Sequence, residues 1–204
     1  MNQQKMKVIN LLTVTVLCLL LLFCVLPVHG EGEIYQRVLR LHVIANSDSD
    51  LDQSLKLHVR DAVLEYCAPL LSEVSSREQA AAVVKAHADE IERVAVAALA
   101  EKGCTDRVSL EVCTEKYPMK DYESFCFPAG SYLSVKLRIG EAEGQNWWCV
   151  LFPKLCTQVA ASPEEEFVAV GFTPDQYKII TESDTATYKI RFKLLEFFEE
   201  LKGD

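Results

Sequence analysis

The sequence predicts an α+β fold: a mainly antiparallel sheet of about four strands, an αα-hairpin on one face, and a helix at the C-terminus. Three observations predict it. Apolar and polar residues alternate from Ser131 to Ile139, as in a half-buried strand. Two amphipathic stretches, Leu51–Tyr66 and Arg77–Lys102, are joined by a short link. The expected elements follow one another as strand, helix, helix, strand, strand and strand.

Residues 1–30 are typical of an export signal. Lys5 and Lys7 precede an apolar run from Val16 to Leu26, and Pro27 and a small residue at Gly30 follow. An uncleaved membrane anchor is the alternative, although the apolar stretch is shorter than the roughly 20 residues that span a bilayer comfortably. We therefore expect a signal peptide over 1–30, an α+β domain over 31–160, and an acidic linker with a final helix over 161–204.

The charge balance argues against a nucleic-acid partner. The chain has a formal charge of −9, and beyond residue 30 it carries 19 basic and 30 acidic side chains. A protein that binds nucleic acid needs basic surface to displace counterions from phosphates. The same balance disfavours docking on anionic lipid, so membrane contact is expected only through the signal segment or a partner.

The first expected strand, Ile34–Asn46, leads into a helix. Asp48, Asp50 and Asp52 have the spacing that begins a calcium loop, but Gln53 stands where that loop needs glycine. We interpret Ser49 or Asp50 as the N-cap of the helix instead. No metal and no cofactor are expected.

The second helix is predicted from about Arg77 to Lys102. Ser75 and Glu78 have the spacing of a capping box, and Gly103 is placed to end the helix in the left-handed conformation. In an antiparallel pair of helices Cys67 and Cys104 lie far apart, and we expect no bond between them.

A strand from Arg107 to Lys116 and a hairpin complete the expected sheet. The hairpin pairs Ser131–Ile139 with the apolar run Trp147–Phe152 through a turn at Gly140–Gly144. Beyond it, the sequence suggests a linker, a short edge strand and a helix capped by Asp184 or Thr185, in the ranges 162–166, 167–170 and 184–204.

Six cysteines follow the signal segment: Cys67, Cys104, Cys113, Cys126, Cys149 and Cys156. In an exported chain an even number is consistent with disulfides, and equally with free thiols packed as small hydrophobic groups. Cys149 and Cys156 are the pair that we most readily join in a disulfide.

No catalytic motif is present in the sequence. A cysteine nucleophile needs a histidine base, and His58 and His87 are placed as ordinary helix residues. His42 could face a cysteine across the sheet, so an exported thiol-dependent hydrolase using Cys126 or Cys149 is the alternative function. We expect that the protein is not an enzyme.

Trp147 and Trp148 are adjacent and should point to opposite sides of their strand. One indole can fill the core under the helices. The other is either covered by the segment before the hairpin or exposed to a partner, as tryptophans at interfaces often are. We expect a partner to contact the following residues: Tyr117, Tyr122, Pro128, Trp147, Trp148 and Phe152.

Four segments in order resemble the stage II sporulation protein R family. They are LRLHVIANSDSDLDQSLKLHVRDAVL at 39–64, YPMKDY at 117–122, FPAGSY at 127–132 and NWWCVLFPKLC at 146–156. The family usually has threonine at Met119, glycine at Ala142 and proline at Lys154. The resemblance covers roughly residues 37–156 and weakens beyond Thr157.

The resemblance implies a function. Members of the family are exported from the forespore into the intermembrane space that faces the mother cell. There they activate a membrane-embedded aspartic-type protease, which cleaves the precursor of the mother-cell sigma-E factor. On this interpretation residues 31–160 form a signalling domain, and the partner is that protease. A structural component of the septal space is a third possibility.

Overall fold

The computed structural model describes residues 3–25, 31–122, 125–155 and 167–181, which divide into two compact units. The larger unit contains the described residues between 33 and 116 and between 131 and 177. The smaller unit contains the N-terminal helix and the described residues at 31–32, between 117 and 130, and at 178–181.

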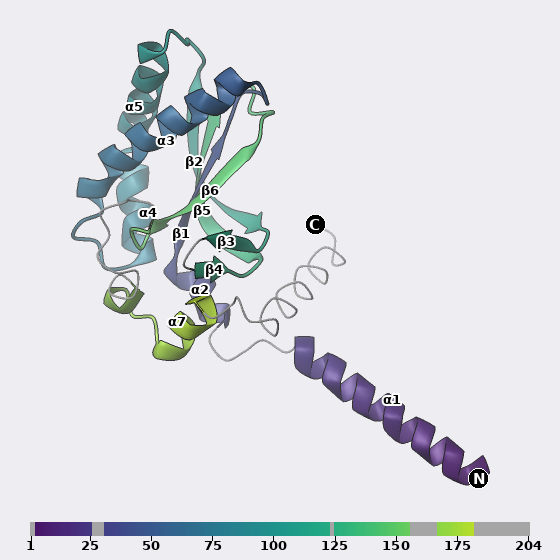
Figure 1. Ribbon diagram of the computed structural model, residues 1–204. Helices are drawn as coiled ribbons and strands as arrows, with labels where there is room; N and C mark the ends of the chain where they lie inside the picture. The colour runs from purple at the N-terminus through teal and green to yellow at the C-terminus, as the bar shows by residue number, and fades with distance from the viewer. Residues whose placement is uncertain (1–2, 26–30, 123–124, 156–166, 182–204) are drawn as a thin grey trace. The chain divides into compact units, whose positions relative to one another are not determined.

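The larger unit is built on a mixed four-stranded sheet (Figure 1). In spatial order its strands are β2 Val108–Tyr117, β5 Gly130–Ile139, β1 Leu39–Ile44 and β6 Asn146–Phe152. β1 is parallel to β5 and antiparallel to β6. β2 is antiparallel to β5, since Arg107 pairs with Gly140 while Glu115, further along β2, reaches back to Lys136. The predicted α+β class and the four strands are confirmed.

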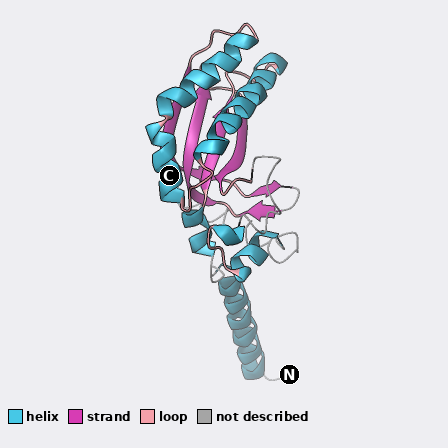
Figure 2. Ribbon diagram, turned by 90° about the vertical axis from the view of Figure 1, so that its left-hand side faces the viewer, coloured by secondary structure: helices cyan, strands magenta, loops and turns pink. Residues whose placement is uncertain are grey.

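Three helices cover one face of this sheet, as Figures 1 and 2 show. They are α3 Asp50–Leu70, α4 Arg77–Ala86 and α5 Ala88–Glu101. α3 packs against α5. The core between helices and sheet includes Leu41, Val43, Val59, Ile91 and Leu137, each at most 1% exposed. The predicted apolar face of the strand at 131–139 is the face that joins this core.

The predicted hairpin of β5 and β6 is wrong, because β1 lies between the two strands. All six residues of β1 are buried, and the strand has a hydrogen-bonded neighbour on each edge. The loop after β5 crosses the end of β1, where the Gly144 amide donates to the Ala45 carbonyl at 3.0 Å. A Cβ on Gly144 would collide with the Ser47 carbonyl oxygen, so this close crossing requires glycine.

The ends of the helices follow the local sequence. Ser49 is the N-cap of α3 and accepts a hydrogen bond from the Asp52 amide, as predicted. The next N-cap is Ser76, one residue beyond the predicted Ser75. The predicted second helix is interrupted at His87, which separates α4 from α5. Gly103 adopts a φ of 75° after α5, as expected of a C-terminal glycine.

Two expectations near the ends of the larger unit are corrected. The first strand starts at Leu39 rather than Ile34, because α2 occupies Glu31–Arg37. Phe167–Ala169 is helical and not an edge strand. The turn that follows this segment contacts α2: Arg37 donates to the Val170 carbonyl at 3.4 Å, and its guanidinium lies 5.9 Å from the Phe172 ring centre.

A short helix, α7, spans Pro174–Thr181. It begins with a capping box in which Thr173 and Gln176 exchange hydrogen bonds between side chain and backbone. The predicted linker at 162–166 and the predicted helix at 184–204 lie outside the described residues, and the proposed domain boundaries stay predictions.

The smaller unit contains α1, Gln3–Val25, and a two-stranded sheet of β3, Lys120–Tyr122, and β4, Phe125–Phe127. This short sheet falls in a segment for which the sequence predicted no strand. Its aromatic rings contact one another: the centres of Tyr122 and Phe125 are 4.9 Å apart, and Phe125 and Phe127 meet edge to face at 5.7 Å.

Candidate functional site

Trp147 and Trp148 lie near the start of β6, an edge strand of the sheet. Their side chains point to opposite faces of the sheet, as predicted. Trp147 lies on the helix face, where the Arg60 guanidinium stands 4.9 Å from its ring centre. Trp148 lies on the other face, 5.6 Å from the His42 ring. Both indoles are half-buried, so each keeps some surface that a partner could contact.

The other predicted contact residues differ in exposure. Tyr122 is half-buried, whereas Tyr117, Pro128 and Phe152 are buried. A buried side chain has little surface to offer in this conformation. The assignment of all six residues to a partner contact remains a prediction, and the exposed area favours Tyr122 and the two tryptophans.

The start of β6 is held in place by side chains from α3 and the loop before it. Asp48 accepts a hydrogen bond from the Gln145 amide at 2.7 Å. The Lys56 ammonium donates to the Gln145 carbonyl at 3.0 Å and to the Gln53 amide oxygen at 2.6 Å. Burial lowers the pKa of Lys56, although Asp48 opposes the shift. Both backbone groups of Gln145 are therefore fixed, which sets the position of the neighbouring Trp147.

The acidic segment before α3 is also hydrogen-bonded internally. The Asp52 carboxylate accepts from the Ser47 hydroxyl at 2.5 Å and from the Asn46 amide at 2.9 Å. These two bonds lower the pKa of Asp52. The sequence predicted a helix cap here but gave no sign that the same segment anchors the start of β6, because the anchoring bonds go to a loop about 100 residues away.

A row of polar side chains crosses the face of the sheet opposite the helices. The Lys136 ammonium lies 2.6 Å from the Glu115 carboxylate, which is 3.2 Å from Nδ1 of His42. Nε2 of His42 lies 2.7 Å from Oδ1 of Asn146. Desolvation raises the pKa of Glu115. Hydrogen bonds from Lys136 and Ser134, together with His42, lower it by more, so the pKa of Glu115 lies below its ordinary value.

Arg40 lies on the same face and is fully buried. Its Nε donates to the Cys149 carbonyl at 3.1 Å, and its guanidinium stands 5.0 Å from the Tyr132 ring centre. Sequence reasoning did not single out Arg40, Glu115 or Lys136, because an alternating strand pattern assigns charged residues to solvent.

The thiols are placed poorly for nucleophilic chemistry. Burial raises the pKa of Cys67 to about 12, and it also raises the pKa of Cys104 and of Cys113. Cys149 is disulfide-bonded. Cys156, its predicted partner, lies outside the described residues, so that pairing stays a prediction. Cys67 and Cys104 are free thiols and do not bond to each other, as expected.

His42 does not face Cys149. Leu41 is the register partner of Cys149, and Trp148 is that of His42, so the cysteine and the histidine lie on opposite faces of the sheet. The contacts of the His42 ring described above are a carboxylate, an amide and an indole.

Among the described residues, α1 is the one helix long and apolar enough to cross a membrane, over Gln4–Leu22. The hydroxyls of Thr13 and Thr15 donate to backbone carbonyls four residues earlier, so neither presents an unpaired donor to an apolar surrounding. A signal sequence has the same length and composition. The helix indicates export, and both cleavage and retention remain open.

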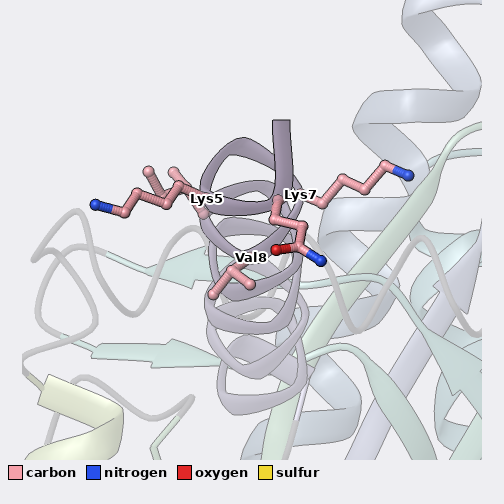
Figure 3. Close-up of a pocket in the computed structure, with 5 residues that line it drawn as sticks. Lys5, Lys7 and Val8 are labelled. Carbon is pink, nitrogen blue, oxygen red and sulfur yellow. The ribbon is translucent and has the colours of Figure 1, made fainter. Parts of the chain in front are cut away.

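A shallow hollow lies beside the start of α1. Five residues from the first turns of that helix line it: Gln4, Lys5, Lys7, Val8 and Ile9. Figure 3 shows Lys5 and Lys7 extending to opposite sides of the helix. A hollow lined by one helix alone has no opposing walls to enclose a ligand, so it is not a binding site.

Comparison with known proteins identifies the family. The model of the family described as stage II sporulation protein R matches residues 35–162. The chain belongs to the stage II sporulation protein R family. The matched range contains all four strands of the main sheet and the three helices that cover it.

A curated relative is stage II sporulation protein R of Bacillus subtilis (strain 168), to which the chain is 38% identical over 120 residues. That match covers 59% of this chain and 54% of the relative, so the chain spans about half the length of the relative it matches. No solved structure matches the chain. Membership of the stage II sporulation protein R family assigns the protein a role in sporulation.

Proposed function

We propose that the chain is an exported sporulation signal that activates a membrane-embedded aspartic-type protease. Activation leads to processing of the sigma-E precursor in the mother cell. The observation that supports the proposal most strongly is the family match over residues 35–162. The apolar N-terminal helix agrees with export from the forespore into the intermembrane space.

Activation by a protein of this kind is a matter of differential binding. A partner shifts a protease toward its active state only by as much as it binds that state more tightly than the inactive one. The half-buried Trp147 and Trp148 suit such a contact, because the hydrogen bonds at Gln145 hold the start of their strand in one position before binding. No bond-making step by the protein itself is needed.

The alternative, a thiol hydrolase, has less support. It requires a low-pKa thiol beside a base, and the described thiols Cys67, Cys104 and Cys113 have raised pKa values. Cys149, one of its two candidate nucleophiles, is disulfide-bonded. The other candidate, Cys126, is buried.

Single alanine substitutions of the two tryptophans test the proposal. Trp147→Ala removes an indole that packs on the core and under Arg60, so we expect a loss of about 2 kcal/mol in unfolding free energy. Trp148→Ala should abolish cleavage of the sigma-E precursor in a sporulating strain while keeping the circular dichroism spectrum. Trp148→Phe is the matched control and should restore part of the signal.

Normal precursor cleavage in the Trp148→Ala strain, at equal protein level, would remove Trp148 from the contact. Replacing His42, Cys126 and Cys149 addresses the alternative. Loss of signalling in a variant that still folds would favour the hydrolase.

A further inference from the structure

β2 forms one edge of the main sheet and is longer than β6, the strand at the other edge. β2 is ten residues long and stands at the end of the strand order. Because the Arg107 carbonyl accepts from the Gly140 amide, odd-numbered residues direct their backbone groups toward β5. The even-numbered Leu110, Val112 and Thr114 therefore direct theirs away from the sheet.

One of these outward groups is already satisfied by a side chain. The Leu110 amide donates to Oε1 of Glu92 on α5 at 2.6 Å. At Val112 and Thr114, no other strand of the described chain lies alongside, and the Thr114 side chain is exposed. An unpaired strand edge is a template on which another chain can pair, and only the Leu110 end of this edge is covered by a side chain in this way.

A hollow of about 360 Å³ adjoins this edge, and α5 and β2 line it with Asp89, Glu92, Arg93, Val96 and Val108. Its floor is partly apolar, since Val96 is 42% exposed. A strand added to β2 would lie about 4.8 Å from it, with every second side chain on the α5 side of the sheet. Those side chains would reach the hollow.

The charges around the hollow favour a basic occupant. Arg93 is paired with Glu90 at 2.9 Å, and Arg107 with Glu141 at 3.5 Å. Asp89 and Glu92 have no cationic partner among the described residues. Two adjacent carboxylates on one helix face can each accept from a lysine or arginine, whereas an acidic segment would be repelled.

We propose that the outer edge of β2 binds an extended segment of a partner protein by strand addition. The segment pairs its backbone with Val112 and Thr114, places a basic side chain beside Asp89 and Glu92, and places an apolar side chain over Val96. Backbone pairing supplies affinity in this mode, and the alternate side chains supply specificity. The proposal goes beyond protease activation, because it concerns a different surface from the tryptophans and stands whichever protein donates the segment.

The test uses the full chain in detergent micelles and a labelled synthetic nonapeptide. Seven of its nine residues are four threonines that alternate with one lysine and two valines, so that lysine and valine share a face, and one further threonine stands at each end. We expect a dissociation constant on the order of 10–100 μM by fluorescence anisotropy. Hydrogen exchange should slow in residues 108–116. A peptide with proline at the central position is the control and should not bind.

Two protein variants locate the contact. Thr114→Pro removes an outward donor but no bond to β5, and it should weaken peptide binding at least tenfold while the circular dichroism spectrum is kept. Glu92→Gln still accepts from the Leu110 amide, so it should weaken binding about threefold through lost charge alone. Glu65→Gln, an exposed position on α3 away from the hollow, is its matched control and should leave the affinity unchanged.

The proposal is overturned if no binding is seen at 1 mM peptide (about 4 kcal/mol of binding free energy). Exchange protection confined to other strands would also overturn it. A concentration-dependent dimer that Thr114→Pro abolishes would show that a second copy of the chain occupies the edge instead. If Thr114→Pro fails to fold, the pair Glu92→Gln and Glu65→Gln and the exchange map decide the question.

Discussion

Both faces of β1, an inner strand of the main sheet, are buried, but by different means. Leu41 and Val43 of β1 point into an apolar core under α3 and α5. Arg40 and His42, their neighbours on the same strand, point to the opposite face and are 0% and 7% exposed. In most half-buried strands, alternate residues are buried and exposed to solvent. In β1, alternate residues are instead buried on an apolar face and on a polar face.

The difference lies in how each face tolerates change. An apolar contact is non-directional, so its loss costs the transfer free energy of the deleted atoms plus a cavity. A polar contact in a buried place depends on its partner, and removal of one member leaves the other desolvated and unpaired. The polar face should therefore accept fewer kinds of side chain at each position than the apolar face, although it contributes less net stability.

The largest effect is expected on the helix-covered face. Leu137→Ala should lower the unfolding free energy by about 3 kcal/mol, because Leu137 is fully buried among the core residues. Urea denaturation monitored by circular dichroism measures the change. A loss below about 1 kcal/mol would mean that this face collapses around the cavity and is less tightly packed than the structure indicates.

The next effect is expected on the polar face. Glu115→Ala should cost about 2 kcal/mol, because it leaves Lys136 and His42 without their shared carboxylate. Glu111→Ala is the matched control on the same strand: Glu111 pairs with Arg138 across the same two strands, but the side chains are 50% and 40% exposed. That exposed pair should contribute less than about 0.5 kcal/mol. Equal losses for the two variants would erase the distinction between buried and exposed polar contacts.

The pH dependence of stability distinguishes the faces further. The pKa of Glu115 is lower in the folded state than its ordinary value of 4.5. Its contribution is therefore present above about pH 4.5 and is lost as the pH falls through the folded-state pKa. Between pH 6 and pH 3.5, wild type should lose more stability than Glu115→Gln, whereas Leu137→Ala should lose as much as wild type. Parallel curves for wild type and Glu115→Gln would show that Glu115 does not gain from its neighbours.

The smallest effect is expected at the turn that leaves β5, beyond both faces. Ala142 has a φ of 57°, in the left-handed region that an alanine side chain disfavours. Ala142→Gly should raise the unfolding free energy by about 1 kcal/mol, and the thermal midpoint should rise accordingly. An unchanged or lowered midpoint would mean that the alanine is not strained there.

The four strands of the main sheet and α3 were predictable from local patterns, whereas the arrangement of the strands was not. The alternation at 131–139, the Ser49 cap and Gly103 depend on neighbouring residues, and each was placed correctly. The hairpin was wrong because a strand's pattern specifies its faces and not its neighbours. β1 is the most fully buried of the described strands. Its burial on both faces could not be recognised from apolar residues, because the buried Arg40 interrupts the apolar pattern.

The candidate site was predictable in part. The opposite orientation of Trp147 and Trp148 follows from the period of a strand. The hydrogen bonds of Asp48 and Lys56 to Gln145 were not predictable, because their partners lie about 90 to 100 residues away in the chain. Glu92 could have been suspected only once its helix was known to lie beside an edge strand.

The position of β1 between β5 and β6 has a consequence for the order of assembly. Leu39 pairs with Leu133 on one side and with Phe152 on the other, so both neighbours of β1 follow it by about 90 residues or more. In a chain that crosses a membrane with its N-terminus leading, β1 emerges before either of the strands that pair with it. The sheet is complete only once β6 has followed, so a chain truncated or stalled before β6 lacks one edge of the sheet.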